Sequence, residues 1–168
     1  MRKLIPRVLV LFSFFALAGA HPPKEVPSVM TLKQMEAYQT GIPVDENLPA
    51  ETFGYPNPRH VLDLAQKLDL SAEQKSQIQN LLKITLDRAL YFGRKIVAEE
   101  LLLDDFFRKG EVDYAALSNR LESIGNSRWR LRLAHLEAYL KTKMVLNTDQ
   151  LKKYHELCAA SPEGVSSK

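Results

Sequence analysis

Cysteine and the motifs of common enzyme classes are almost missing from this sequence of 168 residues. The single cysteine, Cys158, cannot form a disulfide within one chain, which leaves a bond to a second copy or a small helical side chain near the C-terminus. No Gly-rich phosphate loop, HExxH-type motif or nucleophile beside a base and an orienting group occurs. The neighbouring carboxylates Glu99-Glu100 and Asp104-Asp105 would point about 100° apart on a helix, so they do not form facing acid–base pairs. We therefore expect a protein that is not an enzyme.

Long apolar runs are also missing, apart from a short one near the N-terminus. Residues 8–17 are apolar and precede a small-residue cleavage site at 18–20. Three basic residues come before them: Arg2, Lys3 and Arg7. Because the run is too short to cross a bilayer, we expect a cleaved signal peptide over 1–20, no stable membrane anchor, and a periplasmic mature chain that starts at His21.

The chain carries no net charge once this segment is set aside. The sequence has 23 Lys and Arg against 20 Asp and Glu, and three of the basic residues lie in the predicted signal peptide. The remaining chain is formally neutral. This balance gives no support for nucleic acid or an anionic membrane as a partner.

Proline is concentrated in one part of the chain. Seven of the nine prolines lie close together: Pro22, Pro23, Pro27, Pro43, Pro49, Pro56 and Pro58. That density forbids long regular structure, so we expect a proline-rich flexible arm over 21–56, with at most a brief helix over 31–39 that Gly41 ends. A helical domain is expected over 57–159 and a disordered tail over 160–168.

Apolar residues at helical spacing predict four helices in this domain. The first covers 58–69, with proline at its first position after Asn57. The second begins at Ser71 and continues to Gly110, and the third, capped by Asp113, returns antiparallel to it and ends near Leu146. A terminal helix follows through about Ala159.

The two central helices are too long for a compact domain. About 39 and 33 residues correspond to roughly 58 and 50 Å. Such a hairpin cannot bury both wide apolar faces alone, so it either dimerises or leaves an apolar concave face exposed. Gly93 and Gly125, midway along the two helices, indicate a bend or a close helix contact. The predicted fold is all-α: an elongated antiparallel hairpin with shorter flanking helices, in a curved dimer.

A short signature occurs twice, as Leu70-Ser71-Ala72-Glu73-Gln74 and Leu146-Asn147-Thr148-Asp149-Gln150. In each copy Ser71 or Asn147 is placed as N-cap, and the glutamine three residues later can reach back to the cap's own N–H, as in a capping box. The acidic residue before each glutamine lies in the first turn, where the helix dipole favours it. Leu146 and Leu151 are also spaced as a hydrophobic staple. The residues Leu70, Ser71, Gln74, Leu146, Asn147 and Gln150 therefore form a paired helix-capping signature.

The paired signatures, the export signal and the long hairpin resemble the periplasmic family of the Spy and CpxP stress proteins. The signature of that family is Leu-Thr-x-x-Gln near the start of two helices, and here Ser71 and Asn147 replace the threonine. The resemblance covers residues 57–158. It implies a curved all-α homodimer that acts without nucleotide as a chaperone for unfolded proteins, or that binds the periplasmic domain of a sensor or regulator in an envelope-stress response.

For a chaperone we expect apolar patches edged by charge. Arginine and tryptophan are effective at protein contacts, and basic residues beside an apolar groove attract acidic partners. The candidate client or partner surface consists of Phe92, Leu101, Phe106, Phe107, Arg128, Trp129, Arg130 and Arg132. The alternative interpretation is that the apolar stripe forms the core or a dimer interface, and that Arg128–Arg132 is a solvated face.

A second hypothesis is a heavy-metal sensor or resistance protein that binds Zn, Cu or Ni, because zinc-resistance-associated and CnrX-type relatives belong to the resembled family. The mature chain offers few ligands, and no two histidines stand four residues apart. His135 lies on the apolar stripe and is followed one turn later by Tyr139, a poor ligand, so a core histidine is the alternative. His21 with the freed α-amine is the other weak candidate. No cofactor is expected, apart from such a divalent metal under this hypothesis.

Overall fold

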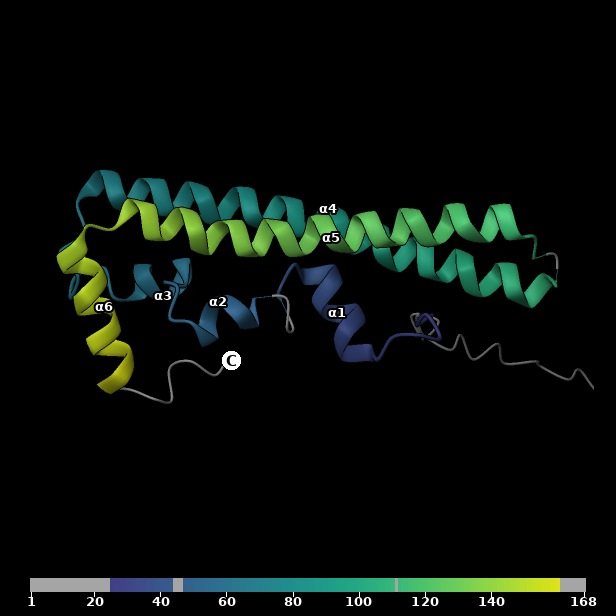
Figure 1. The fold of residues 1–168 in the computed structure, drawn as a ribbon, viewed down its shortest axis with the longest axis horizontal. Coiled ribbons are helices and arrows are strands. Elements are labelled where there is room, and N and C mark those ends of the chain that lie inside the picture. The colour runs from purple at the N-terminus through teal and green to yellow at the C-terminus, as the bar shows by residue number, and fades with distance from the viewer. Residues whose placement is uncertain (1–24, 44–46, 111, 161–168) are drawn as a thin grey trace, which may run out of the picture.

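The computed structural model describes residues 25–43, 47–110 and 112–160, and these parts of the chain contain helices but no strand (Figure 1). The elements are α1 (Leu32–Thr40), α2 (Leu48–Thr52), α3 (Pro58–Asp63), α4 (Ala72–Lys109), α5 (Tyr114–Val145) and α6 (Thr148–Ala160). Helices α4 and α5 form a long antiparallel pair, and the shorter helices lie along one side and at one end of it. The predicted all-α fold with a long hairpin and flanking helices is confirmed.

The long helices begin and end close to the predicted residues. Ser71 caps α4 by accepting from the backbone N–H of Gln74 at 3.1 Å, and Gly110 ends that helix with a φ of 71°. Asp113 caps α5 by accepting from the backbone N–H of Ala116 at 2.9 Å. The 38 residues of α4 correspond to about 57 Å of helix. Gly110, which tolerates the left-handed region, and the Asp113 cap therefore fix the hairpin turn, and Ser71 fixes the other end of α4.

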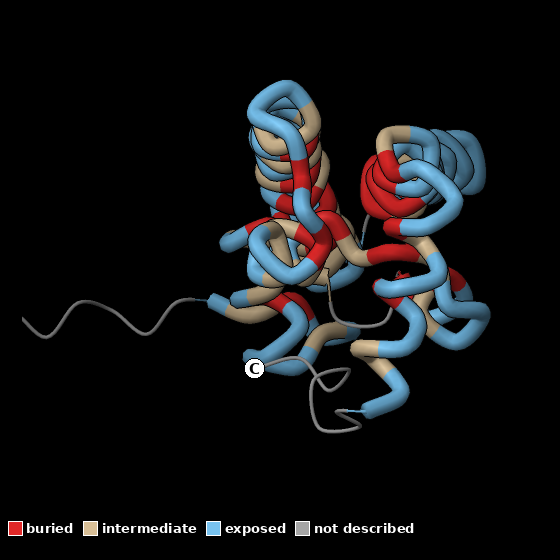
Figure 2. Tube along the Cα trace, turned by 90° about the vertical axis from the view of Figure 1, so that its left-hand side faces the viewer, coloured by how far each residue is buried: buried red, intermediate tan, exposed pale blue. Residues whose placement is uncertain are grey.

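The two long helices face one another through a narrow apolar seam. Residues buried on α4 and α5 include Ile78, Ala89, Ile96, Val97, Ile124, Leu131, Ala134 and Ala138. Ion pairs bridge the seam along its length: Arg88 to Glu137 at 2.6 Å and Arg128 to Glu100 at 2.7 Å. Figure 2 shows that buried positions are turned inward between the helices, while exposed positions cover their outer sides.

A separate apolar cluster closes the open end of the hairpin. Its buried members come from α3, the starts of α4 and α6, and the segments between them: Val61, Leu68, Leu70, Ile78, Leu146 and Tyr154. Leu151 packs against this cluster together with Leu146, as the predicted hydrophobic staple requires. The cluster holds α6 across the end of the long pair (Figure 1).

Helix α3 is shorter than predicted. The sequence predicted a helix over 58–69, but α3 ends at Asp63 and turns follow as far as Asp69, whose φ is +50°. The turns place Leu68 and Leu70 in the apolar cluster, with 1% and 6% of their surface exposed. Burial of these two leucines therefore takes precedence over the helical spacing of the residues before them.

The expectation of a loose arm over 21–56 differs from the structure in its described part. Thr31 and Gln34 form a reciprocal capping box that starts α1, and Gly41 ends it, as the sequence predicted for the brief helix. Helix α2 follows, with Pro49 in its first turn, where a missing N–H costs little. Residues 25–43 pack against the hairpin, because Met30 and Tyr38 contact the apolar seam. Proline density limited helix length here but did not prevent packing.

Some predictions lie outside the described residues: the signal peptide over 1–20, the start at His21, and the tail beyond Ala160. Ala160 itself is the last residue of α6. Within the described ranges, none of the helices combines the length and the apolar character needed to cross a membrane.

Candidate binding surface

The two capping signatures meet in space. Each glutamine side-chain oxygen accepts from the backbone N–H of its own N-cap, Ser71 to Gln74 at 3.0 Å and Asn147 to Gln150 at 3.1 Å. The same two amides then bond to each other: Gln74 Nε2 donates to Gln150 Oε1 at 2.8 Å, and Gln150 Nε2 donates to Gln74 Oε1 at 3.0 Å. We call this reciprocal pair the glutamine clasp.

The clasp uses the bonding capacity of both amides. The second N–H of Gln74 donates to the carbonyl of Val145 at 2.9 Å, and that of Gln150 donates to the carbonyl of Leu68 at 3.2 Å. A primary amide offers two N–H donors and two oxygen lone pairs, and each here has a partner. Gln150 is only 9% exposed, so losing one partner would leave buried polar groups unsatisfied. The signature residues therefore join the starts of α4 and α6.

An exposed aromatic and cationic cluster lies midway along the hairpin. The Arg130 guanidinium carbon lies 6.0 Å from the centre of the Phe92 ring and 5.7 Å from that of Trp129. Tyr91 meets Phe92 edge to face at 5.0 Å. Tyr91 and Trp129 remain 63% and 59% exposed, although aromatic side chains are normally among the most buried on average. We call Tyr91, Phe92, Trp129 and Arg130 the aromatic–arginine patch.

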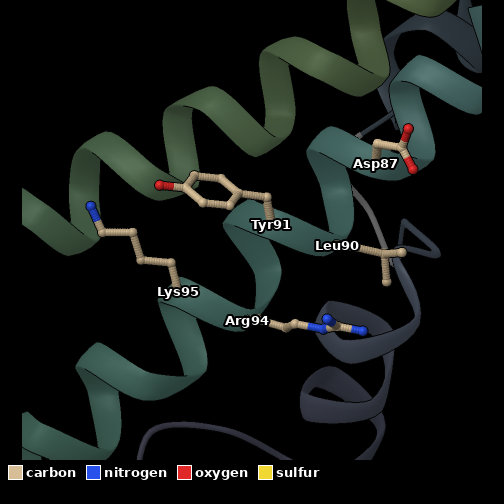
Figure 3. A pocket seen from close by; sticks show the side chains of 5 residues that line it. All are labelled: Asp87, Leu90, Tyr91, Arg94 and Lys95. Atoms are coloured by element: carbon tan, nitrogen blue, oxygen red, sulfur yellow. The ribbon is translucent and has the colours of Figure 1, made fainter.

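A shallow groove of about 570 Å³ continues from this patch along α4 (Figure 3). Its lining combines apolar and charged side chains: Asp87, Leu90, Tyr91, Arg94 and Lys95. In Figure 3 Tyr91 and Lys95 lie on the side of α5, whereas Leu90 and Arg94 point toward α1. The groove therefore has an aromatic wall and two cations, which suits contact with an apolar or acidic chain segment.

The distal end of the hairpin carries a second, smaller cluster. Phe106 and Phe107 meet edge to face at 6.4 Å, and the Arg120 guanidinium carbon lies 5.3 Å from the centre of the Phe106 ring. Phe107 is 56% exposed. Leu101 is half-buried and lies more than one helical turn from both phenylalanines along α4. This end is thus a separate apolar surface with an arginine at its edge.

The arginines predicted as one candidate surface divide into different roles. Arg130 belongs to the aromatic–arginine patch, and Arg132 is exposed on α5. Arg128 instead pairs with Glu100, whose surface is only 6% exposed, so its charge is committed to the hairpin seam. Sequence reasoning missed Tyr91, Arg94, Lys95 and Arg120. Lys95 lies three residues after Phe92, and Arg94 and Lys95 lie three and four residues after Tyr91, so their shared helix face was the available signal. Arg120 is on α5, and no local spacing relates it to Phe106.

A buried polar network attaches α2 and the start of α3 to α5. The Tyr139 hydroxyl donates to Glu51 Oε1 at 2.7 Å and accepts from the side chains of Asn47 and Asn57 at 2.6 and 2.9 Å. Burial and the neighbouring Glu51 carboxylate raise the pKa of Tyr139 far above its usual value, so it stays a neutral donor. These polar side chains bond to one another, so the network connects α2 and the start of α3 to α5.

Of the two metal candidates, His135 lies among the described residues. His135 is 6% exposed on the inner side of α5. His60 Nδ1 lies 3.4 Å from the Tyr154 hydroxyl and 3.8 Å from the half-buried Cys158 sulfur. Among the described residues, no three His, Cys, Asp or Glu side chains gather closely enough to hold a metal ion. His21, the other candidate, lies outside them.

The chain matches no family model, no curated protein and no solved structure.

Proposed function

We propose that the protein is an exported, ATP-independent chaperone or envelope-stress binding protein that holds unfolded proteins on the aromatic–arginine patch and the adjoining groove. The single observation that carries the proposal is the exposure of Tyr91 and Trp129 beside Arg130 on a long hairpin. An aromatic side chain in water loses the free energy that burial would give, so an exposed aromatic group points to a partner that covers it.

The chemistry of the patch suits loose binding of many sequences. Aromatic rings accept varied apolar side chains, and Arg130, Arg94 and Lys95 add attraction for acidic segments. The surface is open and shallow, so a bound chain keeps freedom to fold. Resemblance to the Spy and CpxP family, seen in the paired capping signatures, supports the same class of activity and adds the expectation of a homodimer in the periplasm. A sensor or regulator domain would meet the same surface.

The experiment is suppression of aggregation by the metal-free mature chain at near-stoichiometric ratio to a chemically unfolded client. A variant with Tyr91→Ser and Trp129→Ser should lose at least half of the suppression. The matched control, Ile84→Ser and Met144→Ser, removes apolar residues that are 47% and 83% exposed on the same two helices away from the patch, and should keep it. Equal suppression by both variants would refute the proposal that clients bind at the patch. No suppression by the wild type, together with micromolar binding of Zn(II), Cu(II) or Ni(II), would replace the proposal by the metal-responsive alternative.

A further inference from the structure

One apolar face of the hairpin is covered by the protein's own N-terminal segment. Residues 25–43, which include α1, lie along α4 (Figure 1). Met30 and Tyr38 from this segment, together with Phe92, pack against the buried residues Ala89, Ile96 and Leu131. We call residues 25–43 the strap.

Gly93 sets the position of the strap on α4. A Cβ at this position would lie 2.0 Å from the backbone carbonyl oxygen of Tyr38, so only glycine allows this approach. A second glycine, Gly41, allows the strap to approach α4 closely at its other end. It has a φ of +72°, and a Cβ there would lie 2.9 Å from Leu86 Cδ1. Since glycine disfavours a helix interior, its presence in the middle of α4 has a specific packing purpose.

The contacts that hold the strap at its distal end are on the surface. Ser28 donates to the Asp104 carboxylate from its backbone N–H at 2.6 Å and from its hydroxyl at 2.5 Å. Glu25 pairs with Arg108 at 3.3 Å, and both side chains are more than 60% exposed. Exposed ion pairs of this kind contribute little, and α1 has nine residues, too few for a stable isolated helix. The strap therefore depends on the apolar contact with the hairpin.

The covered face is continuous with the aromatic–arginine patch. Phe92 belongs to both, because it contacts the cluster under the strap and lies beside Arg130. Leu90 also lines the groove and lies beside the strap, since a Cβ at Gly41 would be 3.4 Å from Leu90 Cγ. A chain segment bound in the groove would thus meet the edge of the strap.

We propose that the strap is displaceable, and that the face beneath it, formed by Ala89, Ile96 and Leu131, is a docking surface for apolar segments of unfolded clients rich in methionine and aromatic residues. The strap covers this face with the same side-chain types, Met30 and Tyr38. Bound client and docked strap exclude each other, so the strap limits affinity until a client competes with it. This inference rests on the proposed function.

The test uses Gly93→Ala in the full mature chain. The added methyl group expels the strap, while alanine favours the α4 helix itself. Gly125→Ala is the matched control, since it makes the same change in the interior of α5 at a position where a Cβ meets no atom within 4 Å. Hydrogen exchange of amides 32–40 reports the strap, and fluorescence anisotropy with a reduced and alkylated, permanently unfolded protein reports the client.

We expect exchange at 32–40 to accelerate at least tenfold in Gly93→Ala and not in Gly125→Ala. The unfolded probe should bind Gly93→Ala at least fivefold more tightly than wild type, and saturating probe should accelerate exchange at 32–40 in wild type. If Gly93→Ala loses the helical content of α4, Met30→Asp replaces it. This change puts a charge into the apolar contact that holds the strap and leaves α4 and α5 unaltered.

Two results would overturn the inference. In the first, exchange accelerates but affinity for the probe is unchanged, so clients bind away from the covered face and the proposed function stands through the patch alone. In the second, exchange at 32–40 accelerates neither in Gly93→Ala nor in the variant that replaces it, so the strap is not displaceable in this way. A failure of the proposed function is distinct: neither wild type nor Gly93→Ala would bind the probe at all, whatever the exchange shows.

Discussion

Gln74 and Gln150, the third residues after their N-caps, hydrogen bond to each other in both directions, at 2.8 and 3.0 Å. Each side-chain oxygen also accepts from the N–H of its own N-cap. Each amide nitrogen donates to a backbone carbonyl just before the start of the other helix. A repeated local signature thereby becomes a tertiary contact that joins α4 and α6 at the open end of the hairpin.

The glutamine clasp predicts strong coupling between two distant positions. Gln74→Ala and Gln150→Ala should each lower the free energy of unfolding by about 1–3 kcal/mol, because each leaves polar groups of the other amide without a partner. The double variant should cost less than the sum, with a coupling of about 0.5–3 kcal/mol in a urea double-mutant cycle.

A third capping box serves as the control for the clasp. Gln34 caps Thr31 at the start of α1 on the exposed surface, in the same arrangement. Gln34→Ala should cost no more than about 1 kcal/mol and add to either clasp variant without coupling. Additivity between Gln74→Ala and Gln150→Ala would contradict the clasp.

The charge of the buried Glu100 carboxylate is compensated by one arginine. Arg128→Ala should destabilise the protein by about 1–3 kcal/mol, at the lower end of the cost of an unpaired buried charge because Arg128 itself is 45% exposed. Arg132→Ala, an exposed arginine on the same helix, should change stability by less than about 0.5 kcal/mol. Adding Glu100→Gln to Arg128→Ala should restore part of the loss in thermal unfolding. Equal effects of the two arginine variants would show that Glu100 does not need its partner.

The contact of the strap with Asp104 predicts a pH dependence. The Ser28 hydroxyl and then its backbone N–H hold the pKa of Asp104 below its ordinary value of 3.8. Because the folded pKa is lowered, the stabilisation is present above that ordinary value and is lost as the pH falls through the folded pKa. Ser28→Ala removes the larger cause, so the pKa of Asp104 should rise toward 3.8 in an NMR titration of the carboxyl carbon.

Asp105 provides the internal reference for that titration. Its pKa is lowered first by a hydrogen bond from Lys109, so Ser28→Ala should leave it unchanged. Asp105 shifting together with Asp104 would indicate a general change in the helix. An unchanged Asp104 would show that Ser28 does not dock there in solution.

The exposed apolar residues of the hairpin predict self-association. Phe107 and Leu102 are 56% and 49% exposed near the turn, and Leu121 is 50% exposed on the neighbouring helix. A second copy that covered such residues would remove apolar surface from water. Sedimentation of the mature chain at micromolar concentration should therefore show a dimer, and a monomer at ten times that concentration would refute this expectation.

Local signals were sufficient to predict the hairpin, but not its contacts. Ser71, Gly110 and Asp113 act within a few residues of the chain, so the ends of α4 and α5 could be predicted from the sequence. The clasp, the Glu100–Arg128 pair and the Tyr139 network join residues between 28 and 92 positions apart, and no local pattern encodes them. Leu64–Asp69 has helical spacing, yet the turns there follow from the burial of Leu68 and Leu70.

The candidate surface was predicted only in part. Arg130 does lie over the rings of both Phe92 and Trp129, because Trp129 precedes it in the chain and Phe92 faces it across the antiparallel hairpin. Arg128 was included with them, since sequence order alone does not separate an inward position from an outward one. The sequence predicted a bend or a close helix contact at Gly93 and Gly125; Gly93 makes a close contact with Tyr38 of α1, whereas a Cβ at Gly125 would meet no atom within 4 Å. The prolines of the strap favoured a loose segment and concealed its packing.

Direct binding of an unfolded protein is the most decisive measurement. A labelled, reduced and alkylated protein is titrated with the mature chain in the presence of a chelator and without nucleotide, and its anisotropy is recorded together with that of its natively folded form. We expect saturable binding of the unfolded form at micromolar concentration or below, weakened at least fivefold by Tyr91→Ser and Trp129→Ser, and no binding of the folded form. Absence of binding, or equal binding of both forms, would contradict the proposed function.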